Sequence, residues 1–202
     1  MAVAEKLKKM VNAKSCILTN DILHKGKPKA ITLSFNGIDK KNQDDRITST
    51  LAYYFYQNDT PDIYKYEQIN ISVSDGSFSF KKGYNLEEIR TADSLLHFPV
   101  KEFFKWYVND SARYVIDSRL PDSTYHKIEA IMMSTDSSYG KIDDIGFGGW
   151  LTTFLRETNE PLQVFYITAT NGKYVTDYSI AVSLKTRQIV NVTLLDWPHL
   201  KS

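Results

Sequence analysis

Two stretches of this chain alternate apolar and polar residues and are each interrupted by a short turn that contains glycine. The first runs over residues 69–80 with Asp75-Gly76 at its centre, and the second runs over 165–184 with Asn171-Gly172 near its start. Alternation with a period of two is typical of half-buried β-strands, and these dipeptides favour the type I′ turn, in which both central residues have positive φ. The pattern therefore predicts two β-hairpins.

A two-residue turn also predicts which residues face each other in the first hairpin. With Asp75-Gly76 as the whole loop, Val73 faces Phe78 and Ile71 faces Phe80. One face of the hairpin is then apolar, while the serines and the asparagine between these positions share the other face.

Other segments have apolar residues at helical spacing, or short strand-like runs between turn residues. We expect helices at about 3–11, 44–57, 86–96, 99–109 and from 121 onward, a loop at 134–144, and a short helix at about 150–155. We expect further strands at about 16–22, 30–35 and 188–195. The second half of the chain thus reads as helices followed by a three-stranded antiparallel meander.

This element order predicts an α+β protein whose antiparallel sheets are each covered on one face by helices. The stretch 82–85 is a plausible boundary, which predicts two lobes, 1–83 and 84–202; one composite domain is the alternative. In element order, the second half is similar to cone-shaped α+β folds such as the nuclear-transport-factor-2-like group. That similarity implies a pocket between helices and sheet.

Charge and cysteine content narrow the function classes. Lysine plus arginine number 25 and aspartate plus glutamate 24, so the net charge of +1 gives no reason to expect nucleic acid as a partner. No stretch approaches the roughly 20 apolar residues of a membrane span. The single cysteine, Cys16, excludes an intramolecular disulfide and is expected to be buried and structural. The charged start is unlike a signal peptide, so we expect a cytoplasmic protein if this N-terminus is native and leave export open otherwise.

Catalytic motifs are sparse. The four histidines lack the i, i+4 spacing that places two imidazoles on one helical face, so we expect no metal and no cofactor. His126 lies three residues before Glu129 on an expected helix, where a carboxylate could orient the imidazole as a general base. These two residues and Asp177 are our candidates for a pocket. Without a catalytic constellation, a non-enzymatic role is favoured.

Two expected helices carry dense aromatic runs, Tyr53-Tyr54-Phe55-Tyr56 and Phe103-Phe104-Lys105-Trp106-Tyr107, and a helix can bury only part of such a run on its core-facing side. We therefore expect Tyr53 and Tyr56 on one helix, and Trp106 and Tyr107 on another, to form a surface that binds a ligand or a partner protein. Three hypotheses follow: a non-catalytic binding or protein-interaction protein that uses these aromatics, a small-ligand binder or enzyme with a pocket between the second-half helices and the C-terminal sheet, and an immunity or inhibitor-type protein.

Overall fold

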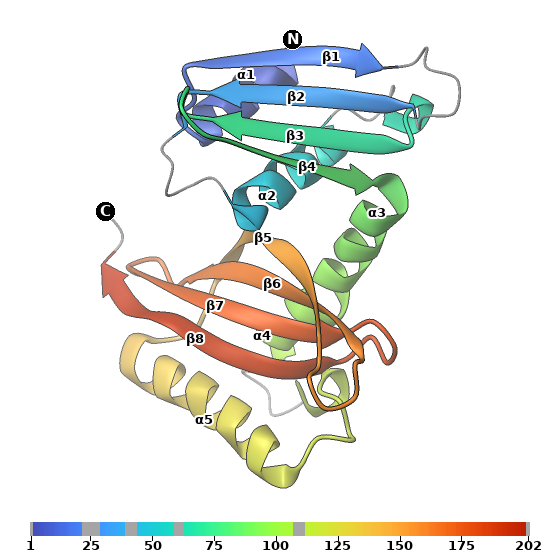
Figure 1. The fold of residues 1–202 in the computed structure, drawn as a ribbon. Coiled ribbons are helices and arrows are strands. Elements are labelled where there is room, and N and C mark those ends of the chain that lie inside the picture. The colour runs from blue at the N-terminus through green and yellow to red at the C-terminus, as the bar shows by residue number, and fades with distance from the viewer. Residues whose placement is uncertain (1, 22–28, 39–43, 59–62, 107–111, 201–202) are drawn as a thin grey trace. The chain divides into compact units, whose positions relative to one another are not determined.

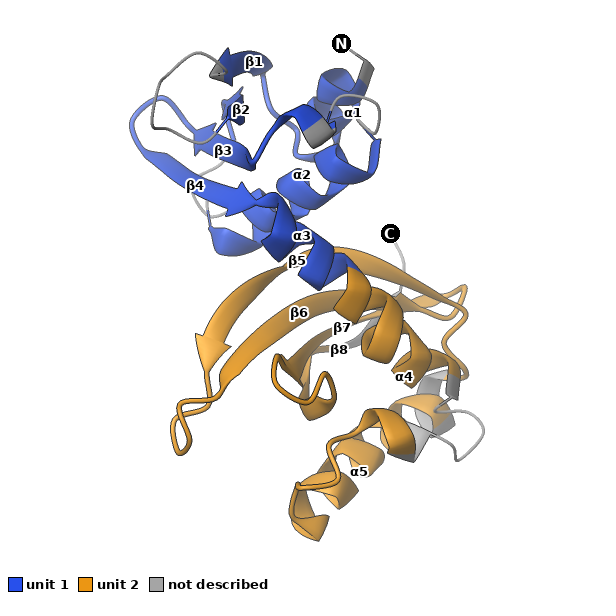
Figure 2. Ribbon diagram, turned by 90° about the vertical axis from the view of Figure 1, so that its right-hand side faces the viewer, with its two compact units in different colours: residues 1–93 blue, residues 94–202 orange. Residues whose placement is uncertain are grey.

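The computed structural model describes residues 2–21, 29–38, 44–58, 63–106 and 112–200. The chain forms two compact units, Met1–Asp93 and Ser94–Ser202 (Figure 2). Each unit contains helices and one four-stranded sheet, which confirms the α+β class. The division into lobes at residue 83 stays a prediction.

The first unit has a mixed sheet with strand order β1-β2-β3-β4 (Figure 1). Its elements are α1 (Ala2–Met10), β1 (Ser15–Asp21), β2 (Ala30–Asn36), α2 (Asp45–Asn58), a 3-10 turn (Ile63–Lys65), β3 (Gln68–Ser74), β4 (Ser79–Asn85) and most of α3 (Leu86–Leu95). The expected antiparallel pairing holds for β1–β2 and β3–β4, but β2 and β3 are parallel. The reason is α2, which carries the chain across the sheet between them and so returns it in the same direction.

One face of this sheet is apolar and packs against helices. Leu33 and Phe35 of β2 and Ile71 of β3 are fully buried, as is Leu51 of α2. Both α1 and α2 lie on the same side of the sheet (Figure 1). The opposite face carries the hydroxyl and amide side chains that alternate with these apolar residues, as the period of two predicted.

The first hairpin is confirmed, but its predicted register was wrong. Val73 pairs with Phe80 and Ile71 pairs with Lys82, each two residues beyond the predicted partner. A shift of two preserves the side-chain faces, so Ile71 and Val73 still face the helices. Phe78, the predicted partner of Val73, lies in the loop and is 44% exposed.

The reason for the shift is a side-chain acceptor that supports a wider loop. The Asp75 carboxylate accepts hydrogen bonds from the backbone N–H groups of Ser77 and Phe78, both at 2.8 Å. In the second hairpin the side-chain oxygen of Asn171 accepts the N–H of Tyr174 at 2.8 Å in the same manner. In both turns only the glycine has positive φ, so neither is the type I′ turn that we predicted.

The second unit has an antiparallel sheet with strand order β5-β6-β7-β8. Its elements are the wide helical turn η3 (Leu96–Lys101), α4 (Glu102–Trp106), the 3-10 turn η5 (Ala112–Val115), α5 (Asp122–Tyr139), β5 (Asp144–Phe154), β6 (Pro161–Thr170), β7 (Tyr174–Ser183) and β8 (Ile189–Leu200). The expected three-stranded meander is β6-β7-β8, and β5 adds a fourth strand at its edge.

The loop expected at 134–144 and the helix expected at 150–155 were both wrong. Helix α5 continues to Tyr139, only residues 140–143 form a loop, and β5 begins at Asp144 and includes residues 150–154. A bulge between Phe147 and Trp150 explains the error: the ladder skips two glycines, so both rings face the same side and pair with Ile167 and Phe165. Phe147 and Trp150 are three residues apart, which is the spacing of neighbours on one helix face, but here a bulge in a strand places both on one side.

The helices of this unit cover one face of the sheet. Phe165 and Ile167 of β6 and Tyr178 and Ile180 of β7 are at most 1% exposed on that face. Helix α5 packs along β8, and α4 lies on the same side (Figures 1 and 2).

Candidate ligand-binding pocket

The predicted aromatic surface is only partly placed by the structure. Tyr53 is in the core rather than exposed: it is 7% exposed, and its hydroxyl donates to the Asp93 carboxylate at 2.8 Å. Burial, and then the hydrogen bond to that carboxylate, raise the pKa of Tyr53. Tyr56 is half-buried on α2. Trp106 ends α4 with its side chain outside the described set, and Tyr107 lies outside the described residues altogether.

The three residues predicted to line a pocket do not come together. His126 and Glu129 form an exposed pair on α5, with 3.4 Å between Nδ1 and Oε2 and 70% of the His126 side chain exposed. Asp177 accepts a hydrogen bond from the Thr168 hydroxyl at 2.6 Å. It alternates along β7 with buried Tyr178, so it faces the side of the sheet opposite to the helices.

In an ionic cluster of the second unit, two largely buried carboxylates pair with Arg119, whose side chain is half-exposed. The Asp117 side chain is 2% exposed, and Arg119 donates to it with Nε and Nη2 while also reaching Glu160 at 3.0 Å. Thr186 donates its hydroxyl to Asp117 at 2.9 Å, and Ser183 donates to Glu160. The hydrogen bonds from Arg119 lower the pKa of Asp117 to about 2. Both carboxylates already accept hydrogen bonds from side chains of this unit. We therefore interpret the cluster as structural, a clamp that holds the loops carrying these residues together.

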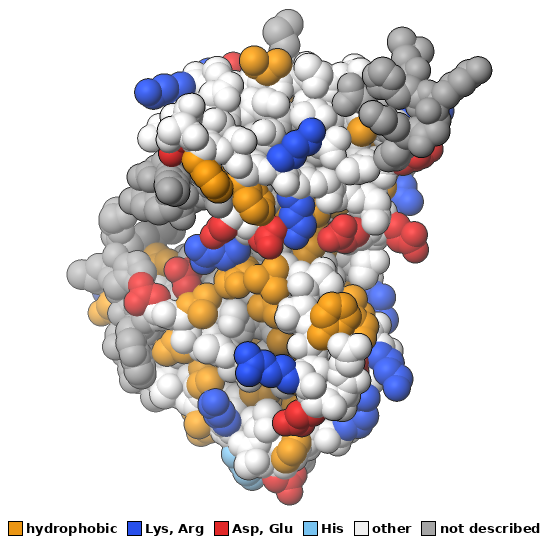
Figure 3. All heavy atoms as spheres, viewed as in Figure 1, with side chains coloured by type: hydrophobic (Ala, Val, Ile, Leu, Met, Phe, Trp, Pro, Cys, Tyr) orange, Lys and Arg blue, Asp and Glu red, His pale blue; other side chains and the backbone are white. Residues whose placement is uncertain are grey.

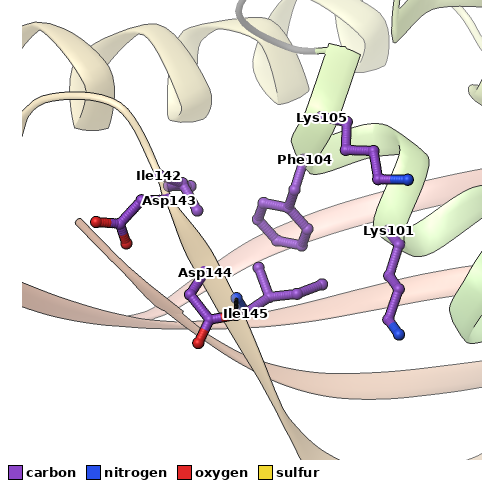
Figure 4. A pocket seen from close by; sticks show the side chains of 7 residues that line it. All are labelled: Lys101, Phe104, Lys105, Ile142, Asp143, Asp144 and Ile145. Atoms are coloured by element: carbon purple, nitrogen blue, oxygen red, sulfur yellow. Dashed lines mark hydrogen bonds between the residues drawn. The ribbon is translucent and has the colours of Figure 1, made fainter. Parts of the chain in front are cut away.

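One pocket among the described residues lies at the start of β5 and has a volume of about 290 Å³ (Figure 4). One side is formed by Lys101, Phe104 and Lys105, which are spaced at i, i+3 and i+4 and therefore share a helix face. The Phe104 ring is 5% exposed and meets the ring of Tyr178 edge-on, with 5.6 Å between centroids. This contact fixes the helical side of the pocket to the sheet.

The other side is formed by Ile142, Asp143, Asp144 and Ile145. Asp144 and Ile145 are the first residues of β5, and Ile145 pairs with Ala169, which lies on the helix-facing side of the sheet. Asp143 is held by its backbone N–H, which donates to the Thr170 carbonyl at 2.9 Å. The Asp143 carboxylate also accepts the Thr170 hydroxyl at 3.3 Å. The strand ladder thus positions this side through backbone bonds.

The lining combines an apolar floor with charges of both signs. Phe104, Ile142 and Ile145 provide the apolar surface, the lysines project from the helical side and the aspartates come from the strand side (Figure 4). Apolar walls with a few polar groups that fix orientation are typical of small-molecule sites. A volume near 300 Å³ is at the small end of such pockets.

Sequence reasoning did not single out Asp143 and Asp144 as site residues, and it missed Lys101, Phe104 and Lys105. Their local signal is two lysines four residues apart with a phenylalanine between them, a pattern common to solvated helix faces. Only the fold shows that this face meets the start of β5.

Further observations bear on the class of site. Within the described ranges, no group of three or more His, Cys, Asp or Glu residues could hold a metal ion. No helix there is long and apolar enough to cross a bilayer. The face in Figure 3 has basic and acidic side chains interspersed rather than one broad basic patch.

No protein-family model matches this chain, and no curated protein or solved structure matches it either. The functional argument therefore depends on the site itself.

Proposed function

We propose that this chain is a non-catalytic binding protein whose second unit holds a small organic molecule in the pocket between α4 and β5. The observation that carries the proposal is the pocket of about 290 Å³, with buried Phe104 in its floor and four ionisable side chains around it. A concave site with an apolar floor and a few convergent polar groups is the default location for a ligand.

The exposure of the charged groups favours binding over catalysis. Activated lysines and carboxylates in enzymes are removed from water by burial or by a close partner. Here the Lys105 side chain is 68% exposed, and Asp143 and Asp144 are exposed. The pocket lining contains no histidine, cysteine or serine among the residues that the structure describes. The site is thus equipped to recognise a molecule by charge and shape.

The proposal is tested by screening the full chain against a library of metabolite-sized carboxylic acids, amines and amino acids by ¹H–¹⁵N correlation spectra. We expect at least one compound to shift the amide signals of Phe104, Asp144 and Ile145. Ile145→Trp should fill the pocket and abolish these shifts. The matched control is Phe154→Trp on the same strand, where the side chain is 56% exposed. A library without hits at these amides, or hits that persist in Ile145→Trp, would refute the proposal.

A second candidate function is protein interaction through exposed aromatics, including the role of an immunity or inhibitor-type protein. Its support is a pair that the sequence did not single out: Phe98 and Tyr114 are 44% and 49% exposed and stack with 6.2 Å between centroids. Gln188 donates to the Tyr114 carbonyl at 3.1 Å and steadies this segment. Exposed aromatic pairs are enriched at partner surfaces.

A double variant, Phe98→Ser with Tyr114→Ser, distinguishes this second candidate function from ligand binding in the pocket. The double variant should lose a partner that co-purifies with the wild-type chain while keeping every ligand-induced shift at Phe104 and Ile145. An unchanged set of co-purifying proteins would remove the support for an aromatic interaction surface.

A further inference from the structure

We propose that β1 is the contact surface of a homodimer, in which it pairs antiparallel with β1 of a second copy and joins two first-unit sheets into one. The inference concerns the first unit and is independent of the pocket in the second. Strand β1 (Ser15–Asp21) lies at the edge of its sheet, where it pairs with β2 alone among the described strands (Figure 1). An edge strand directs alternate backbone N–H and C=O groups away from its neighbour, and another strand can bond to them.

The other sheet edges of this chain carry features that discourage such pairing. Strand β4, at the opposite edge of the same sheet, has Lys81 and Lys82. In the second sheet, edge strand β5 has a bulge and edge strand β8 has breaks in its register. Lysines and bulges protect edge strands from pairing with other chains. The register of β1 is uninterrupted over 15–21, and its described side chains, at 15–20, include no charge and no proline.

The apolar layer on the helix side of this sheet is incomplete at β1. Leu18 lies opposite Leu33 of β2, so both side chains point toward the helices. Leu33 is fully buried, whereas Leu18 is 41% exposed although α1 contacts β1. On the other face of the strand, Ile17 is 54% exposed. A further strand beside β1 removes apolar surface from water on both faces, which favours association.

The sequence of β1 is complementary to itself when two copies run antiparallel. Its central residue is Leu18, so a two-fold axis at this position places Leu18 against Leu18 of the second copy. Ile17 then lies against Thr19 of the second copy, and the reverse pair follows by symmetry. Pairs of apolar and of β-branched residues stabilise neighbouring strands, so no pair in the centre of this arrangement is unfavourable.

The charges at the two ends of β1 favour the same arrangement. The sequence has Lys14 immediately before the strand and Asp21 as its last residue. Antiparallel pairing brings the lysine end of one copy beside the aspartate end of the other, twice by symmetry. A parallel pair would bring like charges together at each end. The orientation of the two copies is therefore set by charge and their register by Leu18.

The size of this contact determines the strength and the limit of the assembly. One pair of seven-residue strands buries less than the roughly 1,600 Å² of a standard interface, so we expect a weak dimer with a dissociation constant on the order of 100 µM. Because pairing occupies the open side of β1 in both copies, assembly stops at the dimer.

Sedimentation equilibrium of the full chain, from about 10 µM to about 1 mM, tests the proposal around that constant. Wild type should show a monomer–dimer equilibrium. Leu18→Lys and Leu18→Glu each place like charges opposite one another at the two-fold axis and should raise the dissociation constant at least about tenfold. An equimolar mixture of the two variants should dimerise again, since opposite charges then meet. This rescue separates the loss of pairing from misfolding, which mixing does not repair.

Phe78→Lys is the matched control, because Phe78 is exposed to a similar extent, 44%, in the loop between β3 and β4. It should dimerise as wild type does. A wild-type chain that stays monomeric over the whole range would overturn the proposal, and the open edge would then be assigned to an extended segment of another protein. Unimpaired dimerisation of Leu18→Lys, a mixture that stays monomeric, or assemblies larger than a dimer would overturn it equally.

Amide hydrogen exchange locates the contact on the chain. Edge-facing amides within residues 16–20 should exchange more slowly at the high end of the concentration range than at the low end, because pairing protects them. Amides of β4 should exchange at the same rate at both concentrations. Concentration-dependent protection at β4 with none at β1 would show that the dimer forms through another surface and would refute the assignment.

Discussion

The ring of Phe104 meets the ring of Tyr178 edge-on, with 5.6 Å between centroids and 66° between the ring planes. Tyr178 is fully buried in the sheet, and burial raises the pKa of its hydroxyl. The contact connects the floor of the pocket to the centre of the second unit. Pocket shape and core packing therefore depend on one side chain.

The first prediction concerns this shared role of Phe104. Phe104→Ala should lower the free energy of unfolding by about 3 kcal/mol, because it leaves a cavity beside Tyr178. It should also abolish ligand binding. Phe104→Leu should cost about 1 kcal/mol and keep a measurable part of the affinity. Urea unfolding followed by circular dichroism gives the first quantity and calorimetry the second; a fully stable Phe104→Ala variant would contradict the packing role.

The second prediction concerns the clamp around Asp117. Asp117→Asn should lower the free energy of unfolding at neutral pH by about 2 kcal/mol, because it removes charge-assisted hydrogen bonds from Arg119 in a buried position. Glu157→Gln, at an exposed carboxylate between β5 and β6, is the control and should change stability little. Urea midpoints of the two variants measure the difference.

The third prediction is the pH dependence of that difference. The pKa of Asp117 is about 2 in the folded chain and 3.8 in its ordinary state, so its contribution is complete above about pH 4 and is lost as pH falls toward 2. The difference in the free energy of unfolding between wild type and Asp117→Asn should therefore become smaller as the pH falls over this range. A gap of constant size from pH 7 to pH 2 would mean that the carboxylate charge is unimportant.

The fourth prediction treats the two units as separate domains. In the first unit the Tyr84 hydroxyl lies 2.7 Å from the Thr48 hydroxyl. Tyr84→Phe removes this bond and should cost about 1 kcal/mol. Calorimetry of the full chain should resolve two transitions, with Tyr84→Phe lowering one midpoint and Phe104→Leu the other. A single transition that moves in both variants would indicate one cooperative domain.

The fifth prediction concerns Cys16, which is half-buried on β1. Burial and the nearby charge of Glu5 raise the pKa of its thiol from 9.0 to about 11. Near pH 8 its thiolate fraction is then about 100-fold lower than that of an unperturbed thiol. Reaction with a disulfide reagent should be slow and should accelerate up to about pH 11. Fast labelling at pH 8 would show that β1 is more accessible than the structure indicates.

Local signals in the sequence were sufficient for the fold class. The alternation around Ile71 and Val73 specifies a strand with one apolar face, and the glycine turns at Gly76 and Gly172 specify where the chain reverses. Both signals act between near neighbours, so they can be read along the chain. The exact register of the first hairpin could not be read along the chain. The Asp75 carboxylate accepts hydrogen bonds from two backbone N–H groups, and these bonds stabilise a wider loop than the two-residue turn.

By itself, the sequence determined that helices and antiparallel hairpins coexist, because side-chain periodicity and turn chemistry are short-range properties. Only the tertiary structure decided that β2 lies parallel to β3, that Phe147 and Trp150 share a strand face across a bulge, and that Lys101 lies at the same pocket as Ile145. These relationships depend on long-range packing, in which residues far apart in the chain meet because their apolar faces must be buried together.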